Sequence, residues 1–426
     1  MTQTDLIIIG AGPGGYRAAE RAAKGGLKVV VFEQQHVGGT CLNVGCIPTK
    51  TYVHSRTFEE ARERQQQVVA QLRQGVETIL AHPDITLVHG HAVFVDAHTV
   101  TSAACGDIVA SNIIVATGSS PRLLSVPGAD STRVVDSTGL LQMDILPKRL
   151  CIIGAGVVGM EFASVFRRFG SEVTVIEYLK ECLPMLDSDI ARRLRKLLEK
   201  RGITFRMKTA VQTLDDIYAD VILMATGRKP NVQADFSNAG FEWDERSGIS
   251  VDAHFQTTQP GIYAIGDVNT RQMLAHAAEW QAGVAVKHIL DNLERPDNMD
   301  TPEYPGHLET RDIPIPSAVF TEPEAACVGP GEDQLKAAAM PYECRKAFYR
   351  ANGRALAMGQ TEGMLKLFCE PGAGRILGCH VYGAHAADLV QEASVLMSMG
   401  ATVAQLRQMV HIHPTLGELL SEAANI

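Results

Sequence analysis

A glycine-rich turn that occurs twice constrains the fold of this chain more than any other feature. Its glycines are Gly10, Gly12, Gly14 and Gly15 in the first copy and Gly154, Gly156 and Gly159 in the second. Each turn follows a short apolar run, predicted to be a buried strand, and opens a segment with the apolar spacing of a helix. The glycines allow a tight turn and the close approach of a pyrophosphate to the N-terminus of the helix. Each copy therefore predicts a dinucleotide-binding βαβ unit.

An acidic residue ends each copy in the same place. Glu33 and Glu177 follow the second strand pattern of their copies and lie 144 residues apart, as do Gly10 and Gly154. A carboxylate in this place accepts hydrogen bonds from a ribose diol. A single glycine turn also serves ordinary strand–helix packing, but two copies with matching acids favour two nucleotide sites. We therefore expect one tightly held cofactor and one that exchanges.

Each copy is followed by an apolar strand pattern that ends in Ala-Thr-Gly. Thr117 and Gly118 end the first of these patterns, and Gly227 ends the second. A third strand pattern leads into Gly266 and Asp267, where a carboxylate can bind a ribityl or ribose hydroxyl. An ordinary turn acid is the alternative interpretation of Asp267.

Two of the nine cysteines stand apart from the other seven, which are scattered as small buried side chains usually are. Cys41 and Cys46 follow directly on the first nucleotide unit. On a regular helix their side chains would point about 140° apart, so a bond between them requires a distorted backbone, which Gly45 and Pro48 make plausible. A strained bond across a short loop is reducible, which predicts a catalytic disulfide. Metal binding and two unreactive thiols are the alternatives, although no second Cys/His pair has a zinc spacing.

Length and charge narrow the class of protein. The 426 residues exceed what one hydrophobic core usually supports, which predicts two or three domains. The net charge of −9 argues against nucleic acid as the main partner, because phosphate binding needs clustered Lys and Arg. The sequence contains no unbroken run of about 18 apolar residues, so a transmembrane helix is not expected. The first residues also lack the pattern of a signal peptide. We therefore expect a cytoplasmic protein.

Together, these motifs resemble the pyridine nucleotide–disulfide oxidoreductase family. The resemblance covers nearly the whole chain and includes the block 314–329, the segment 378–383 and the motif 411–418. It implies an α/β fold with two Rossmann-like dinucleotide-binding domains, one for FAD and one for NAD, plus a C-terminal α+β dimerisation domain. The implied segments are 1–147 for the first part of the FAD-binding domain, 148–245 for a shortened NAD-binding domain, 246–308 for the return to the FAD-binding domain and 309–426 for the interface domain.

The resemblance also implies roles for individual residues. Cys41 is the interchange thiol, which forms a mixed disulfide with the substrate, and Cys46 lies against the flavin. Lys50 and Glu161 lie near the flavin and the nicotinamide, with an ordinary surface charge as the alternative for either. The cofactor-binding positions of the family fall on Gly10, Gly12, Gly14, Gly15, Glu33, Gly39, Thr40, Lys50, Thr117, Gly118, Gly154, Gly156, Gly159, Glu177, Gly227, Gly266, Asp267, Ala275 and His276.

The C-terminal motif implies a catalytic base. His413 takes a proton from a dithiol substrate, because the ordinary pKa of histidine, about 6.5, suits exchange near neutral pH. Glu418 holds the other ring nitrogen, and the pair reaches across a homodimer into the disulfide site of the partner. His411 keeps a structural interpretation.

Two further observations favour the branch of the family that oxidises dihydrolipoamide and reduces NAD. Glu177 would repel a 2′-phosphate, and residues 178–180 contain no arginine cluster, so NAD is expected rather than NADP. The tail after His413 contains no cysteine, so the extra C-terminal thiols of other branches are absent. The implied partners are a lipoyl-bearing acyltransferase or carrier protein of a 2-oxo acid dehydrogenase or glycine cleavage system. An NAD(P)H-dependent reductase of another small disulfide and a non-catalytic flavoprotein subunit are the alternatives.

One segment departs from the family pattern. Between Arg206 and Ala219 the chain is short, where relatives usually carry a longer antiparallel excursion. We therefore expect a trimmed NAD-binding domain with altered NAD affinity and intact disulfide chemistry.

Overall fold

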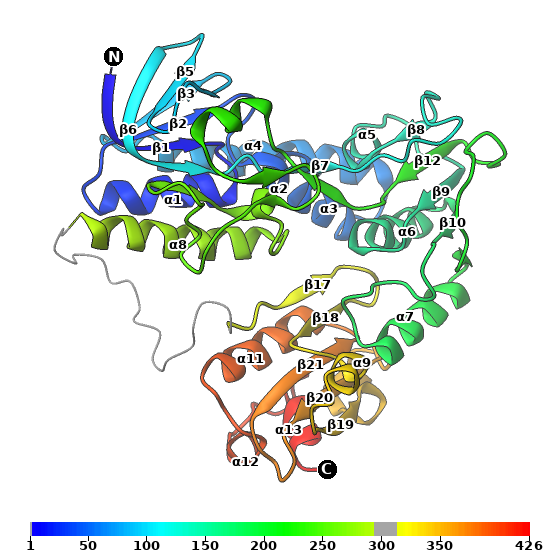
Figure 1. Ribbon diagram of the computed structural model, residues 1–426. Coiled ribbons are helices and arrows are strands. Elements are labelled where there is room, and N and C mark those ends of the chain that lie inside the picture. Colours follow the sequence, from blue (N-terminus) through cyan, green and yellow to red (C-terminus); the bar gives the residue numbers. More distant parts are fainter. Residues whose placement is uncertain (1, 294–312) are drawn as a thin grey trace. The chain divides into compact units, whose positions relative to one another are not determined.

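The computed structural model describes residues 2–293 and 313–426 (Figure 1). The chain forms two compact units, one from Met1–Arg122 and Arg228–Glu303 and the other from Leu123–Gly227 and Tyr304–Ile426. The implied segment boundaries of the four-part division stay predictions, and the boundary between 308 and 309 lies outside the described residues.

A parallel sheet with the first predicted βαβ unit at its centre organises the first unit. The strand order is β3-β2-β1-β6-β5-β4, and β16 pairs with β6. The five strands β3, β2, β1, β6 and β16 pair in parallel, whereas β4 and β5 form an antiparallel flap on β6. The strands are β1 (Thr2–Ile9), β2 (Val29–Glu33), β3 (Ile85–His89), β4 (Val93–Phe94), β5 (Thr99–Ser102), β6 (Gly106–Val115) and β16 (Ile262–Ala264).

Helices cover the parallel strands of this unit. Figure 1 shows α1 and α8 side by side below the sheet, and their small side chains let them approach closely. Ala18, Ala19 and Ala22 of α1 and Ala282 and Ala285 of α8 are fully buried in the core that they share with β1 and β2. The helices are α1 (Pro13–Lys24), α2 (Gly39–Val44), α3 (Cys46–Val53), α4 (Phe58–Leu80) and α8 (Ala275–Asn292). A short antiparallel pair joins β7 (Ser119–Pro121) to β13 (Arg228–Pro230), and β14 (Trp243–Asp244) pairs with β15 (Gly248–Ile249).

The second predicted βαβ unit forms one half of the second unit of the chain. All pairings in its sheet are parallel, in the order β11-β10-β9-β12-β8. Its strands are β8 (Val134–Val135), β9 (Arg149–Ile153), β10 (Glu172–Ile176), β11 (Thr204–Arg206) and β12 (Val221–Met224). Its helices are α5 (Ser137–Leu141), α6 (Val157–Phe169) and α7 (Ser188–Lys200). The glycine turns therefore predicted both βαβ units correctly.

The shortened segment of this half contains no helix or strand over residues 207–220, all of which are described. It still covers the sheet, because Leu214 is fully buried against β9 and β12. Arg133 fixes the segment by donating hydrogen bonds of 2.6 Å to the carbonyl oxygens of Leu214 and Ile217. The trimmed NAD-binding domain stays a prediction.

The C-terminal half of the second unit is an antiparallel sheet in the order β17-β18-β21-β20-β19. Its strands are β17 (Ser317–Val319), β18 (Ala325–Val328), β19 (Glu343–Phe348), β20 (Met364–Cys369) and β21 (Ile376–Tyr382). Its helices are α9 (Glu332–Ala337), α10 (Gly353–Ala357), α11 (Ala386–Ser398), α12 (Val403–Leu406) and α13 (Glu418–Ala424). Helices α11 and α13 share a core with one face of the sheet, which includes Leu365, Leu367 and Val381.

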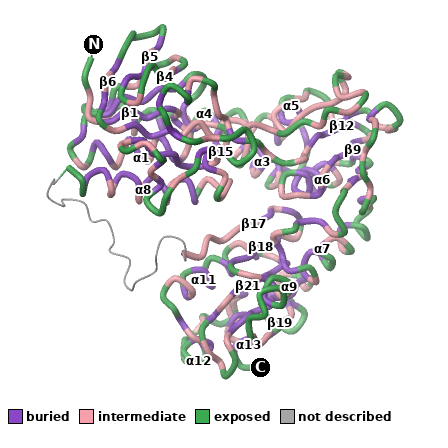
Figure 2. The backbone as a smooth tube through the Cα atoms, viewed as in Figure 1, coloured by how far each residue is buried: buried purple, intermediate pink, exposed green. Residues whose placement is uncertain are grey.

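Burial follows the strands in both units (Figure 2). The runs 6–9, 113–115 and 221–224 are buried throughout, as expected for strands covered on both faces. Together, the two parallel sheets and the C-terminal α+β part confirm the expected fold class. None of the helices in residues 2–293 and 313–426 has the length and apolar character that crossing a membrane requires.

Candidate active site

The two glycine turns are matched hydrogen bond by hydrogen bond. The N–H of Ala11 donates to Glu33 Oε2 at 2.9 Å, and the N–H of Ala155 donates to Glu177 Oε2 at 2.6 Å. The other carboxylate oxygens accept from the backbone two residues on, at Gln35 and at Leu179. The N–H donors are therefore 144 residues apart in the two copies, as the glutamates that accept from them are. Both carboxylates are fixed beside their turns.

Glycine is required where these turns cross the strand ends. Gly10 and Gly154 have φ of +103° and +108°, which side chains other than glycine rarely adopt. A Cβ atom on Gly10 would lie 2.5 Å from the carbonyl oxygen of Ala116, and one on Gly154 would meet that of Ala225 in the same way. By contrast, a Cβ atom on Gly156 would meet no other atom within 4 Å. We call the two turns, 10–15 and 154–159, the first and second cradles. The second cradle thus has free space at Gly156, where a pyrophosphate would approach the helix, and it fits a dinucleotide.

The segment after the first Ala-Thr-Gly contacts a partly buried carboxylate. The hydroxyl of Ser119 donates to Asp267, and the guanidinium of Arg228 donates to the Ser119 hydroxyl at 2.6 Å. Burial raises the pKa of Asp267, while the Ser119 hydrogen bond and Arg228 act in the opposite direction. Sequence reasoning selected Asp267 and missed Ser119 and Arg228, although both directly follow an Ala-Thr-Gly motif.

The two thiols lie on either side of a helix break. Cys41 belongs to α2, Cys46 begins α3, and Gly45 between them leaves the helical conformation with φ −134° and ψ −112°. A Cβ atom on Gly45 would lie 2.8 Å from the carbonyl oxygen of Thr40, so a larger residue would push the two helices apart. The expected backbone distortion at Gly45 is confirmed. The sulfurs are not bonded to each other in this structure.

The environment distinguishes the two thiols. The hydrogen bond with Cys46, burial and the charge of a Cys46 thiolate raise the pKa of Cys41 far above its ordinary value. Lys50 on α3 lowers the pKa of Cys41, but by less. Since Cys46 is exposed, a thiolate there is the better solvated of the two.

A polar anchor holds the thiol segment on the long helix α4. The amide of Asn43 donates to the carbonyl oxygens of Val37 and Gly39, and Arg73 of α4 donates to the Asn43 side-chain oxygen at 2.7 and 3.0 Å. Sequence reasoning missed both residues. Asn43 lies within the thiol motif and was open to detection, whereas Arg73 carries no local signal.

The C-terminal motif has the arrangement of a base held by an acid. His413 Nδ1 lies 2.9 Å from Glu418 Oε1, at the start of α13. The His413 side chain is 79% exposed, and its Nε2 has no partner among the described residues. The hydrogen bonds from His413 and from the Thr415 N–H lower the pKa of Glu418, so the carboxylate stays charged.

The remaining predicted residues are distributed over both units. Ala275 and His276 begin α8 in the first unit. Glu161 lies on α6 in the second unit, is buried, and accepts a hydrogen bond of 2.9 Å from the Phe320 N–H. Lys50 and the cysteines belong to the first unit, whereas Glu161, His413 and Glu418 belong to the second.

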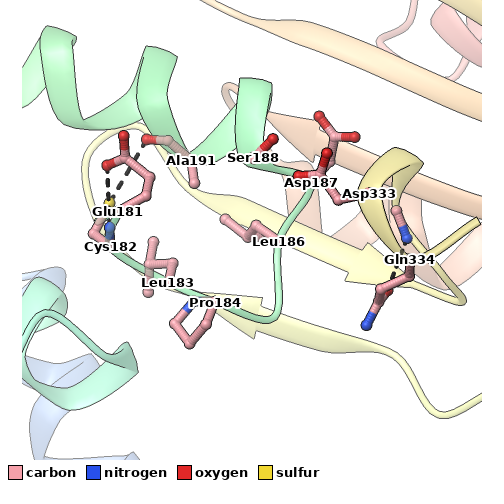
Figure 3. A pocket seen from close by; sticks show the side chains of 11 residues that line it. Glu181, Cys182, Leu183, Pro184, Leu186, Asp187, Ser188, Ala191, Asp333 and Gln334 are labelled. Atoms are coloured by element: carbon pink, nitrogen blue, oxygen red, sulfur yellow. Dashed lines mark hydrogen bonds between the residues drawn. The ribbon is translucent and has the colours of Figure 1, made fainter. Parts of the chain in front are cut away.

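A small pocket lies apart from these residues in the second unit (Figure 3). It has a volume of about 120 Å³ and lies between the segment 181–188 and the start of α9. Its polar lining includes Asp187 and Asp333, and none of the predicted site residues takes part. In the described part of the chain, no group of three or more His, Cys, Asp or Glu side chains is arranged to hold a metal ion.

Two family models match the chain. Residues 4–282 match the model described as pyridine nucleotide-disulphide oxidoreductase, and residues 315–424 match the dimerisation domain of the same family. The chain is 34% identical to the mitochondrial dihydrolipoyl dehydrogenase of Pisum sativum, over 99% of this chain and 91% of that protein. It is 34% identical to dihydrolipoyl dehydrogenase 3 of Pseudomonas aeruginosa, over 100% and 98%, and to leghemoglobin reductase of Glycine max, over 99% and 87%.

Solved structures agree with this result. The Cu(II) complex of the HOCl-induced flavoprotein disulfide reductase RclA from Escherichia coli superposes with a TM-score of 0.90 at 30% identity. The match covers 99% of this chain and 100% of that one. The alignment with the Pisum sativum protein spans 469 residues against 426 in this chain, so that relative carries segments that this chain lacks.

Proposed function

The chain belongs to the pyridine nucleotide–disulfide oxidoreductase family, and we propose that within it the protein is a dihydrolipoamide dehydrogenase. In the proposed reaction, dihydrolipoamide is oxidised to lipoamide and NAD is reduced to NADH. FAD, as in the rest of the family, carries the electron pair between the cysteines and the nicotinamide when it is bound. The observation that carries the proposal is the His413–Glu418 pair, whose free Nε2 suits proton transfer from a dithiol.

The proposed dithiol step uses the cysteines in an order that their environments support. A substrate thiolate attacks the sulfur of Cys41 in the Cys41–Cys46 disulfide, and the bond to Cys46 breaks. His413 of the partner subunit then takes the proton of the second substrate thiol, and the resulting thiolate attacks the substrate sulfur of the mixed disulfide, which closes the substrate disulfide and releases Cys41 as a thiolate. The His413 imidazolium returns its proton to Cys41, whose raised pKa favours the thiol form, and the negative charge remains on Cys46. The substrate loses two electrons, and the two cysteines gain them.

NAD is the proposed nucleotide at the second turn. The Glu177 carboxylate is held by the N–H groups of Ala155 and Leu179, so it cannot swing away from a bound ribose. A fixed carboxylate accepts hydrogen bonds from a 2′-hydroxyl and repels a 2′-phosphate.

The match to the dimerisation domain supports a homodimer. We propose that its two active sites are shared, each combining the cysteines of one subunit with the His413–Glu418 pair of the other. A lipoyl-bearing acyltransferase, or the carrier protein of a 2-oxo acid dehydrogenase or glycine cleavage system, is the proposed partner. A cytoplasmic location is proposed with it, since a reducing compartment keeps catalytic thiols free.

Anaerobic stopped-flow spectroscopy tests the proposal. The flavoprotein is mixed separately with dihydrolipoamide and with NADH, and steady-state NAD reduction is then measured. We expect dihydrolipoamide to produce a long-wavelength band from a Cys46 thiolate beside the flavin, and Cys46→Ser to abolish the band while the flavin stays bound. An oxidised spectrum that dihydrolipoamide leaves unchanged would refute the lipoamide assignment.

A second candidate is an NAD(P)H-dependent reductase of another small disulfide. The likeness to the RclA protein, which is described as a flavoprotein disulfide reductase, favours it. In this case NADH would reduce the flavin rapidly whereas dihydrolipoamide would not react. A non-catalytic flavoprotein subunit would turn over neither substrate, and the complete set of Cys41, Cys46, His413 and Glu418 argues against it.

A further inference from the structure

His411 lies two residues before His413, and the surroundings of the two rings are opposite. The His411 side chain is 11% exposed, and its Nε2 lies 2.9 Å from Glu392 Oε1 on α11. Its Nδ1 is buried without a hydrogen-bond partner among the described residues. The His411 ring is therefore held from one side only, by Glu392.

The backbone around His411 has few other ties. The N–H groups of residues 410–413 have no hydrogen-bond partner in the part of the chain that the structure describes. Val410 and Ile412 on either side are 98% and 79% exposed, and His413 is exposed as well, so His411 is the residue of the segment 410–413 that turns inward. Without the contact of His411 to Glu392, little within the described part of the chain would hold the segment in this arrangement.

The segment is fastened again beyond His413. The N–H of Thr415 donates to Glu418 Oε2 at 2.9 Å, and the buried Asn352 donates to the Thr415 carbonyl oxygen at 3.2 Å. His413 therefore lies between two anchors, His411–Glu392 before it and the contacts of Thr415 after it.

We propose that His411 is a positioning residue, which through its hydrogen bond to Glu392 fixes the direction in which His413 offers Nε2 to a dithiol. The inference rests on the proposed function, because it assigns a task to the support of the proposed base. A base must lie within hydrogen-bond reach of the proton that it takes, and a displacement of about 1 Å can lower a rate about a hundredfold. The His411–Glu392 pair thus supports the segment, and the exposed His413–Glu418 pair takes part in the reaction.

The matched variants are His411→Ala, Glu392→Ala and His411→Gln, tested in the flavin-loaded dimer. The alanine variants are expected to lower kcat for dihydrolipoamide oxidation by about 10- to 100-fold, with flavin content and NADH–ferricyanide activity unchanged. His411→Gln is expected to retain activity within about threefold, because its side-chain amide can donate to Glu392. The double alanine variant is expected to be no slower than either single variant, since both remove the same contact.

The chain supplies its own control. His385, just before α11, forms a similar pair with Asp388 at 3.3 Å, but its side chain is exposed. His385→Ala is expected to leave dithiol oxidation unchanged. Equal slowing of the dithiol and NADH reactions in His411→Ala, or a His411→Gln variant as slow as His411→Ala, would show a merely structural role and overturn the inference.

Limited proteolysis tests the anchoring without reference to any substrate. Thermolysin cuts before apolar residues such as Val410 and Ile412, and cleavage there requires a loosened backbone. We expect His411→Ala and Glu392→Ala to be cut in this segment about tenfold faster than the unaltered protein, and His411→Gln and His385→Ala at its rate. If the unaltered protein fails to oxidise dihydrolipoamide, the proposed function falls, and the cleavage rates still decide whether His411 holds the segment.

Discussion

The two glycine turns share their internal hydrogen bonds but differ in what surrounds them. At the first turn, Glu33 is only 8% exposed, and the thiol segment packs directly on the turn. A Cβ atom on Gly39 would lie 2.7 Å from the Cα atom of Gly12, so the two backbones touch. The first cradle is therefore closed by the same segment that carries Cys41.

The second cradle is open. Tyr178 and Leu179, which follow Glu177, are exposed, and no neighbouring backbone crowds Gly156. The same local sequence thus produces one enclosed cradle and one accessible cradle. A cofactor that stays bound suits the enclosed one, and a nucleotide that leaves in each turnover suits the accessible one.

The substitution Gly10→Ala, in the enclosed cradle, is expected to have the largest effect on cofactor binding. The left-handed conformation alone costs a non-glycine residue about 1–2 kcal/mol, and the Cβ atom would also overlap the Ala116 carbonyl. The closed cradle leaves no room to relax, so the purified protein should lack flavin, measured by its absorbance ratio. The matched Gly154→Ala should keep its flavin and raise KM for NAD by about tenfold or more. Flavin loss in both variants would mean that the two cradles are equally rigid.

The substitution Lys366→Met is expected to have the next largest effect, on the segment 183–187, which is tied to the open cradle because the Leu183 N–H donates to the Ala155 carbonyl oxygen at 2.9 Å. At the end of this segment the Asp187 carboxylate lies 2.8 and 2.9 Å from Lys366 Nζ, and both side chains are 1% exposed. Removing Lys366 leaves a buried charge unpaired, which typically costs about 3–5 kcal/mol. The thermal unfolding midpoint should fall and KM for NAD should rise, with flavin content unchanged. Lys336→Met, which removes an exposed partner of Glu332, should alter neither quantity.

A pH dependence of stability should arise beside the same ion pair. His380 is fully buried, accepts a hydrogen bond from the Asp187 N–H, and burial lowers its pKa to about 4. The unfolded chain, with a pKa of about 6.5, binds a proton in this window that the folded chain does not. Stability is therefore complete above pH 6.5 and is lost as pH falls towards 4, by about 3 kcal/mol in total. Thermal unfolding at pH 7 and pH 5 measures the loss, which His380→Gln should remove.

Substitutions of Glu33 and Glu177 are expected to have the smallest effects and test the difference in enclosure between the two cradles. Glu33→Gln leaves only one side-chain oxygen to accept from the buried Ala11 N–H and the Gln35 N–H, and a lost hydrogen bond there typically costs about 1–3 kcal/mol, so FAD should bind about 10- to 100-fold more weakly. Glu177→Gln, at the open cradle, should raise KM for NAD by only about threefold and improve the use of NADP. Fluorescence titration of FAD and kcat/KM for both nucleotides measure these effects. Equal losses at both acids would contradict the difference in enclosure.

Local sequence patterns predicted both βαβ units, because their causes are local. Apolar runs form buried strands, and a residue with φ near +105° next to a carbonyl oxygen must be glycine. The break at Gly45 followed from the same kind of reasoning, whereas the trimmed segment after Arg206 was inferred from the family pattern and stays a prediction. The roles of the cysteines and of the His413–Glu418 pair came from family resemblance and stay predictions.

The contacts that support these residues depend on the tertiary structure. Lys366 meets Asp187 across 179 residues, and Arg228 meets Ser119 across 109, with no motif to link either pair. His411 and His413 belong to one motif, yet only packing against α11 buries the first ring and leaves the second exposed. The sequence alone determined the nucleotide units, since steric limits on the backbone act between neighbours. Which side chains are buried, paired or exposed was decided only when distant segments packed, because burial and ion pairing depend on residues that no local pattern brings together.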